Sequence, residues 1–175
     1  VVALVAHGTP SPAVNRVRGH VAEQLRARLV GDGGAEAAAV EVVACSMERR
    51  EGQEFAFNEP LLEDILSHPP VAATDPATTP LVLAMLFLQP GKHAGAGGDV
   101  DQLVEEAQRR WAEGEGQGRA ARRVLKTGLL APHPLLIDLL VRANPSAHAI
   151  APRVDVVLSC VWVGRRRTAS AKRSL

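Results

Sequence analysis

The sequence predicts an α/β protein of three layers, in which a mostly parallel sheet of four strands carries helices on both faces. Two observations favour this fold class. Short apolar segments alternate with longer segments of helical periodicity. The strongest apolar segment, Pro80–Leu88, is continuous in Leu, Val, Met and Phe, which is typical of a strand covered on both faces. Strands that alternate with helices pair in parallel through right-handed crossovers, and these place helices on both faces of the sheet.

The amino-terminal part supplies a strand, a helix and a second strand. Val1–Ala6 is a short apolar segment that predicts a buried strand, and Ala13–Val30 follows it with helical periodicity. The apolar residues that recur at helical spacing are Val14, Val17, Val21, Leu25 and Leu29. The glycines at 31–34 are typical of a helix end. A second strand is predicted over Ala38–Cys45, and the polar segment SMERREGQEFAFN after it has the length of a functional or mobile loop.

The middle of the chain supplies a helix, the central strand and another helix. NEPLLEDILSH predicts a helix that starts at Asn58, because an acidic first turn precedes an apolar face. The strand over Pro80–Leu88 leads into QPGKHAGAGGD, whose glycines and proline end regular structure. A helix is then expected over Val100–Trp111.

The carboxyl-terminal part adds a fourth strand over Arg123–Leu130 and a last helix over His133–Ala143. Pro134 suits the first turn of that helix, where its missing N–H has no helical partner. Val154–Gly164 offers a further edge strand, although an arginine run follows it directly. Residues 149–175 are therefore expected to hold an uncertain edge strand and a basic, disordered tail.

Composition bounds the class of protein. A chain of 175 residues that is 46% hydrophobic can bury one sizeable core, which predicts one domain. Five of its 20 basic residues follow Gly164 and none of its 19 acidic residues does, so residues 1–164 have a charge balance of −4. This balance argues against a nucleic-acid-binding domain, which usually presents a basic face.

Cysteine usage and hydropathy indicate the compartment. Cys45 and Cys160 form no CxxC pair and are too few for a disulfide framework, which favours a reduced intracellular protein. No apolar run reaches the roughly 20 residues that cross a bilayer, so no membrane partner is expected. We expect a cytoplasmic location, or a plastid one if a targeting segment precedes Val1, because the chain does not open with methionine.

Two histidines follow strands that belong to the same predicted sheet. His7 comes directly after the first strand, and His93 lies in the glycine-rich loop after the central strand. The carboxyl ends of parallel strands meet at one edge of an open sheet, where ligands bind, so these side chains can converge. Two imidazoles can bind a divalent metal ion through their neutral nitrogens, or accept protons near neutral pH.

Other interpretations of the polar residues stay open. GKHAGAGG offers a lysine and many backbone N–H groups to a phosphate, but it matches neither established phosphate-loop pattern. Ser11 has the chemistry of a hydrolase nucleophile, yet the chain contains no GxSxG elbow. His20 and His68 are expected at the surface or at helix ends, and His133 either caps a helix or lies at the edge of the site. His148 lies in the uncertain carboxyl-terminal part.

Four segments in order resemble the signatures of the class II chelatases, the sirohydrochlorin cobalt- or ferrochelatase family. They are LVAHGTPSP, FNEPLLEDIL, FLQPGKHAGAGGD and LLAPHPLLIDLL, and by their order the match covers roughly residues 1–143. Each motif is short, so it is their order and context that give the resemblance its specificity. The resemblance implies a chelatase domain over residues 1–148 with the α/β fold described above.

The resemblance implies roles for particular residues. His7 and His93 match the two histidines that bind the metal ion and accept protons, although Thr9 stands where serine is usual. Glu59 matches the acidic site residue, and Glu48 competes for that part because its loop is longer here. The second loop also departs from the pattern, since extra glycines separate His93 from the next acid. Expected substrate contacts come from Lys92, Thr9 and Ser11.

The implied activity is insertion of Co²⁺ or Fe²⁺, as a substrate, into sirohydrochlorin or a related tetrapyrrole, with no permanent cofactor. Two pyrrole protons must leave, and an imidazole with an ordinary pKa near 6.5 can accept them. The short members of the family pair as homodimers, so a homodimer is expected. Two other functions remain: a tetrapyrrole or metal carrier without turnover, and an anion-binding module that uses the glycine-rich loop.

Overall fold

The computed structural model describes residues 1–32, 40–68, 79–113, 122–131 and 133–143. The predicted edge strand over 154–164, the tail over 149–175 and His148 lie outside this range. The chain divides into two compact units, Val1–Ala131 and Pro132–Leu175. The first holds the sheet and the second holds helix α5 (Pro134–Ala143).

The first unit is built on one parallel sheet, as the sequence predicts. Its strands are β1 (Val2–Ala6), β2 (Val42–Ser46), β3 (Leu81–Met85) and β4 (Val124–Lys126), in the order β2-β1-β3-β4. All three neighbouring pairs are parallel. β1 is therefore central, and the loops after β1, β2 and β3 leave the same edge of the sheet side by side.

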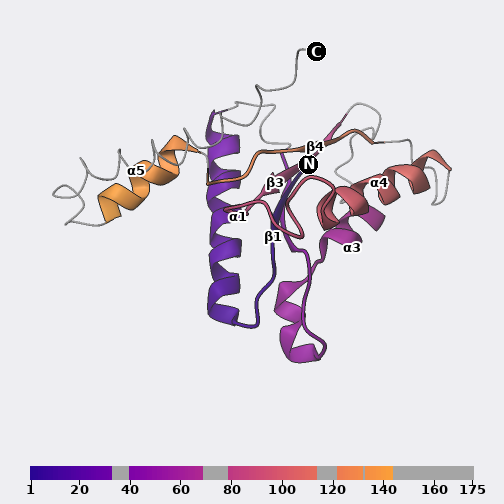
Figure 1. Cartoon of the computed structure of the whole chain (residues 1–175), viewed down its shortest axis with the longest axis horizontal. Coiled ribbons are helices and arrows are strands. Elements are labelled where there is room, and N and C mark those ends of the chain that lie inside the picture. Colours follow the sequence, from indigo (N-terminus) through magenta and orange to yellow (C-terminus); the bar gives the residue numbers. More distant parts are fainter. Residues whose placement is uncertain (33–39, 69–78, 114–121, 132, 144–175) are drawn as a thin grey trace, which may run out of the picture. The chain divides into compact units, whose positions relative to one another are not determined.

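Helices cover both faces of this sheet (Figure 1). Helix α1 (Pro12–Asp32) lies on one face, and helices α3 (Leu62–Ser67) and α4 (Asp99–Ala112) lie together on the other. A short 3-10 helix, η1 (Gln53–Asn58), occupies the polar segment between β2 and α3. The three-layer α/β prediction is confirmed, and none of the helices in the described ranges is long and apolar enough to span a membrane.

The core lies between the sheet and the pair α3 and α4. β3 alternates buried and half-buried residues, with Leu81 and Leu83 fully inaccessible to solvent. Leu62 and Leu66 of α3 and Val100 of α4 pack into the same cluster. Removing such a leucine from water contributes roughly 1.5–3 kcal/mol to folding, so this cluster holds the strand ends in place.

The first apolar residues of α1 do not pack against the core. Val14 is 57% exposed and Val17 is 58% exposed, whereas Arg18 and Ala22 are buried. Arg18 turns inward because backbone carbonyls and a hydroxyl of the sheet side accept hydrogen bonds from its guanidinium. The helix predicted from the spacing of the apolar residues is present, but the Val14 and Val17 side chains remain open to solvent at its start.

The predicted helix start at Asn58 is also wrong. Asn58 ends η1 and is fully buried, and α3 begins four residues later at Leu62. The Asn58 side chain binds the backbone of Thr9, so it does not cap a helix. Asp64 supplies the local cap, accepting a hydrogen bond of 3.1 Å from the Leu61 N–H.

Candidate functional site

His7 follows β1 in a turn that only glycine allows. Gly8 has a φ of +108°, a backbone conformation that other residues rarely adopt. A Cβ atom on Gly8 would lie 2.1 Å from the backbone carbonyl oxygen of Glu48. The glycine therefore lets the loop after β1 approach the loop after β2, which brings His7 beside Glu48.

Glu48 is placed by backbone pairing that continues beyond the end of β2. The Met47 N–H donates to the Ala6 carbonyl at 2.8 Å, and the Glu48 N–H donates to the His7 carbonyl at 3.2 Å. These bonds extend the parallel register in which Ala6 faces Ser46. The relative positions of His7 and Glu48 are thus fixed by the sheet.

His93 comes from the glycine-rich loop between β3 and α4. This loop folds on itself, with the Asp99 N–H donating to the Lys92 carbonyl at 3.0 Å and the Val100 N–H to the His93 carbonyl at 3.1 Å. A Cβ on Gly98 would lie 2.5 Å from the Lys92 carbonyl oxygen, so a side chain there would open the loop. His93 is buried at the point where the loop meets α4.

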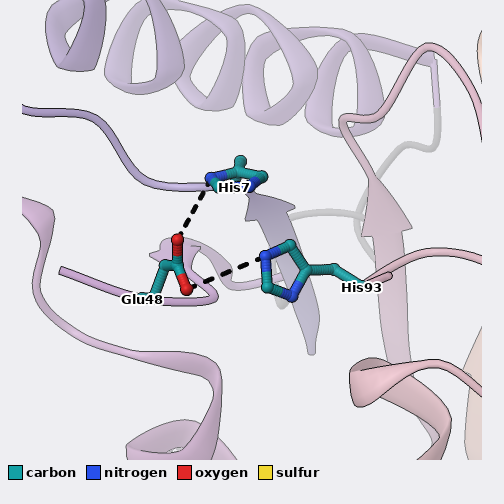
Figure 2. Close-up of side chains that lie close together, drawn as sticks. All are labelled: His7, Glu48 and His93. Carbon is teal, nitrogen blue, oxygen red and sulfur yellow. Dashed lines mark ion pairs between the residues drawn. The ribbon is translucent and has the colours of Figure 1, made fainter. Parts of the chain in front are cut away.

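The structure brings the two predicted histidines together, with an acid between them (Figure 2). The imidazole rings of His7 and His93 have centroids 4.5 Å apart and are inclined at 75°. Glu48 Oε1 lies 3.7 Å from His7 Nδ1, and Glu48 Oε2 lies 3.8 Å from His93 Nε2. One donor atom from each residue fits in a group no wider than 4.8 Å.

The spacing of these donors suits a shared divalent ion. Ligand bonds of about 2.0–2.2 Å at tetrahedral angles put neighbouring donor atoms roughly 3.3 Å apart. The observed nitrogen–oxygen distances are 3.7 and 3.8 Å in a group up to 4.8 Å wide, so the side chains must move closer together to reach that value. Three donors leave a further coordination position for a ligand, which is the arrangement of reactive metal sites rather than of structural ones.

Asp99 holds His93 from behind. His93 Nδ1 donates to Asp99 Oδ2 at 2.7 Å, which places the ring proton on Nδ1 and leaves Nε2 free as a ligand or base. Lys92 Nζ lies 3.3 Å from the same carboxylate oxygen. Partial desolvation raises the pKa of Asp99, but the bonds from His93 and Lys92 outweigh it, so the pKa lies below its usual value. Asp99 is thus an anion that holds the imidazole by its Nδ1 proton.

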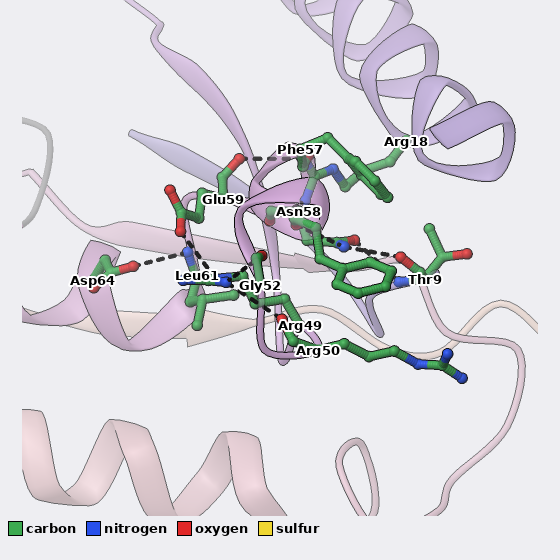
Figure 3. Close-up of polar contacts among 11 residues, drawn as sticks. Thr9, Arg18, Arg49, Arg50, Gly52, Phe57, Asn58, Glu59, Leu61 and Asp64 are labelled. Carbon is green, nitrogen blue, oxygen red and sulfur yellow. Dashed lines mark hydrogen bonds and ion pairs between the residues drawn. The ribbon is translucent and has the colours of Figure 1, made fainter. Parts of the chain in front are cut away.

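Glu59 does not belong to this group. Its carboxylate pairs with the Arg49 guanidinium at 2.9 Å (Figure 3). The structure therefore places Glu48, the competing candidate, at the histidines. In the structure Glu48 follows the end of β2 at the same sheet edge, whereas Glu59 comes after a further helix, η1.

Thr9 and Ser11 shape the turn between β1 and α1. The Thr9 N–H donates to Asn58 Oδ1 at 3.0 Å, and Asn58 Nδ2 donates to the Thr9 carbonyl at 2.9 Å. Thr9 Oγ1 accepts a bond of 3.1 Å from the Ser11 N–H. The contacts of Thr9, Ser11 and Lys92 with substrate stay predictions, and the Lys92 ammonium pairs with the Asp99 carboxylate.

Arg18 is a supporting residue that the sequence reasoning missed. Its guanidinium reaches from α1 to the end of η1 (Figure 3), donating to the carbonyls of Asn58 at 2.8 Å and Phe57 at 3.1 Å. It also contacts Ser46 Oγ. Burial lowers its pKa from the usual value. The available signal was an arginine inside a predicted apolar stripe, where a buried charge requires dedicated partners.

Three N–H groups of the glycine-rich loop are bonded within the loop and to the start of α4. The Gly95 N–H donates to Gly91 and the Gly98 N–H to Gly95, at 2.9 and 3.0 Å, while the Gly97 N–H donates to the Asp101 carboxylate at 2.8 Å. Among the remaining histidines, His133 Nδ1 accepts a bond of 3.3 Å from the Leu135 N–H at the start of α5, so the predicted capping role is confirmed.

Comparisons with known proteins found no family model, no curated protein and no solved structure that matches this chain. The function is therefore argued from the geometry of the site, together with the resemblance of the sequence motifs.

Proposed function

We propose that the chain is a tetrapyrrole chelatase that inserts Co²⁺ or Fe²⁺ into sirohydrochlorin or a related macrocycle. The observation that carries the proposal is the His7–Glu48–His93 group at the carboxyl edge of a parallel sheet, within 4.8 Å. Imidazole and carboxylate donors suit first-row divalent ions. The motif resemblance supplies the class of macrocycle.

The chemistry needs two proton acceptors for each metal ion. A divalent ion M²⁺ and a macrocycle with two pyrrole N–H groups give the metal complex and two protons. As the ion passes from protein donors to pyrrole nitrogens, the lone pairs of His7 and His93 become available for these protons. His93 accepts its proton at Nε2, and Asp99, held at 2.7 Å from Nδ1, stabilises the resulting imidazolium. Glu48 lies between the rings and relays protons.

The site also suits an ion that must be released. The side chains of His7 and Glu48 are more than half exposed. Exposed donors lose more freedom on binding and remain accessible to water, so the ion is held less tightly than in a closed site of four protein ligands. This openness favours transfer of the metal to a second ligand.

Visible absorption spectroscopy tests the proposal. Purified chain is mixed with sirohydrochlorin and Co²⁺, and the spectral change of metal insertion is followed against a control without protein. We expect His7→Ala and His93→Ala each to abolish the catalysed rate without changing the circular dichroism spectrum. His20→Ala, on the exposed surface of α1, is the control and should keep the catalysed rate. A wild-type rate equal to the uncatalysed rate contradicts the proposal.

A carrier of tetrapyrrole or metal is the second candidate. The altered glycine-rich loop favours it, because His93 is held there by Asp99, which also pairs with Lys92. Tight binding of sirohydrochlorin or Co²⁺ without any insertion in the same assay selects the carrier.

A further inference from the structure

Two hollows with different chemistry adjoin the site. The first, of about 230 Å³, is lined by His7 and by the apolar side chains of Ala6, Val14, Val17 and Leu86, with Arg18 among the other residues. The second, of about 620 Å³, contains Glu48 and His93. Each hollow thus holds a different part of the His7–Glu48–His93 group.

The first hollow offers an apolar surface to a ligand. The polar groups that line it are largely bonded to one another: Arg18 donates to Asn58, and Asn58 binds both polar backbone groups of Thr9. What remains open is the apolar edge of α1, where Val14 is 57% and Val17 is 58% exposed. Apolar side chains that stay in contact with water beside a reactive imidazole favour an apolar, flat partner. The buried charge of Arg18 adds a positive potential on this side.

The second hollow is acidic. Four carboxylates line it, against the single ammonium of Lys92; the acids are Glu48, Glu63, Asp99 and Glu106. His93 also lines it, and its Nε2 has no hydrogen-bond partner among the residues that the structure describes, since Glu48 Oε2 is 3.8 Å away. A cleft of one charge sign raises the local concentration of the opposite ion. It attracts divalent cations and repels polycarboxylates.

We infer that the two reactants reach the His7–Glu48–His93 group through different hollows: the flat macrocycle through the apolar hollow at α1, and the metal ion through the acidic hollow at α3 and α4. The inference rests on the proposed function. Charge decides the assignment, because a macrocycle that carries several carboxylates is repelled by the acidic lining, whereas the lining of the other hollow contains no carboxylate and includes the Arg18 cation.

One variant in each hollow tests the inference. Val17→Asp adds a negative charge to the apolar hollow, and Val30→Asp, also on α1 and 39% exposed, is its matched control. Titration with sirohydrochlorin in the absence of metal, followed by absorbance, measures macrocycle affinity. We expect Val17→Asp to lose about tenfold in affinity for sirohydrochlorin, because its carboxylate repels the carboxylates of the macrocycle near the protein surface. The affinity for Co²⁺ should stay unchanged. Val14→Asp repeats the test if Val17→Asp does not fold.

Glu63→Gln removes one charge from the acidic hollow, and Glu105→Gln, at an exposed position of α4 outside it, is the control. Stopped-flow mixing with Co²⁺ alone measures the association rate. We expect Glu63→Gln to slow association several-fold at low salt and to lose this effect at about 1 M salt, where charges are screened within about 3 Å. The affinity for sirohydrochlorin should not change.

The outcomes separate the two levels of the hypothesis. A wild-type chain that binds neither sirohydrochlorin nor Co²⁺ contradicts the proposed function itself. If the wild type binds both, the two-sided arrangement is overturned when Val17→Asp behaves like Val30→Asp, or when Glu63→Gln changes macrocycle affinity and leaves Co²⁺ association as in the control. It is also overturned if Val17→Asp splits a dimer in sedimentation without changing macrocycle affinity, because a second copy then covers the hollow.

Discussion

Replacing Asp99 tests how the structure prepares His93 for its role. Asp99→Ala removes the carboxylate that accepts the Nδ1 proton at 2.7 Å, so the neutral ring becomes free to move that proton to Nε2. The nitrogen that faces Glu48 would then carry a proton and could not bind a metal ion until the proton left. We expect weaker binding of Co²⁺ while His7 and Glu48 stay in place.

The expected magnitude follows from the contact and its exposure. Loss of an acid that supports a metal-binding histidine typically costs 10- to 100-fold in metal affinity. The Asp99 side chain is 30% exposed and shares its oxygen with Lys92, so we expect the lower end, about tenfold. Asp99→Asn keeps a neutral acceptor for the Nδ1 proton. Because charge-assisted hydrogen bonds are roughly twice as strong as neutral ones, we expect Asn to lose about threefold.

Two measurements check this prediction. Calorimetric titration with Co²⁺ gives the affinities of the wild type, the two Asp99 variants and Glu105→Ala, an exposed α4 control with the same change of charge. Nitrogen NMR of the histidine rings reports which nitrogen of His93 is protonated. The reasoning is refuted if Asp99→Ala binds like Glu105→Ala, or if the proton stays on Nδ1 without the carboxylate.

Three further predictions concern the scaffold. Gly8→Ala should weaken Co²⁺ binding and lower the thermal midpoint, because the positive φ alone costs about 1–3 kcal/mol and the new Cβ meets a carbonyl oxygen; unchanged binding would contradict the argument for this turn. Leu83→Ala should lower the free energy of unfolding, measured by denaturant titration, by about 2–5 kcal/mol, whereas Leu88→Ala at an exposed position should change it by no more than about 0.5 kcal/mol. Burial raises the pKa of the Cys45 thiol to about 12, so peptide mass spectrometry should find Cys45 unmodified after iodoacetamide treatment of the folded chain at pH 8; labelling at the rate of a free thiol would show that the residue is not buried.

The sheet and the pairing of the histidines could be predicted from local sequence. Apolar segments such as Pro80–Leu88 report burial on both faces, and parallel topology then places the residues after β1 and β3 at one edge. The meeting of His7 and His93 therefore needs no knowledge of side-chain contacts. The ends of the strands were less certain, since β3 stops at Met85, before the apolar run does.

Contacts between loops could not be predicted in the same way. The choice between Glu48 and Glu59 depends on how far the pairing of β1 with β2 continues and on where η1 turns the chain. The burial of Arg18 and Asn58 depends on carbonyls that become available only once η1 has formed. Periodicity counts side chains along one element, and it carries no information about acceptors that another element presents.

Backbone pairing beyond the ends of β1 and β2 links two of the three donors, His7 and Glu48, while the third donor, His93, lies in a separate loop. The separation of His7 from Glu48 is a property of the sheet, since the bond from the Glu48 N–H to the His7 carbonyl sets it. The position of His93 is a property of one loop. Insertions or deletions between residues 89 and 98 would therefore retune the size of the ion that fits without disturbing the other two donors, which gives protein engineering a single segment in which to alter metal preference.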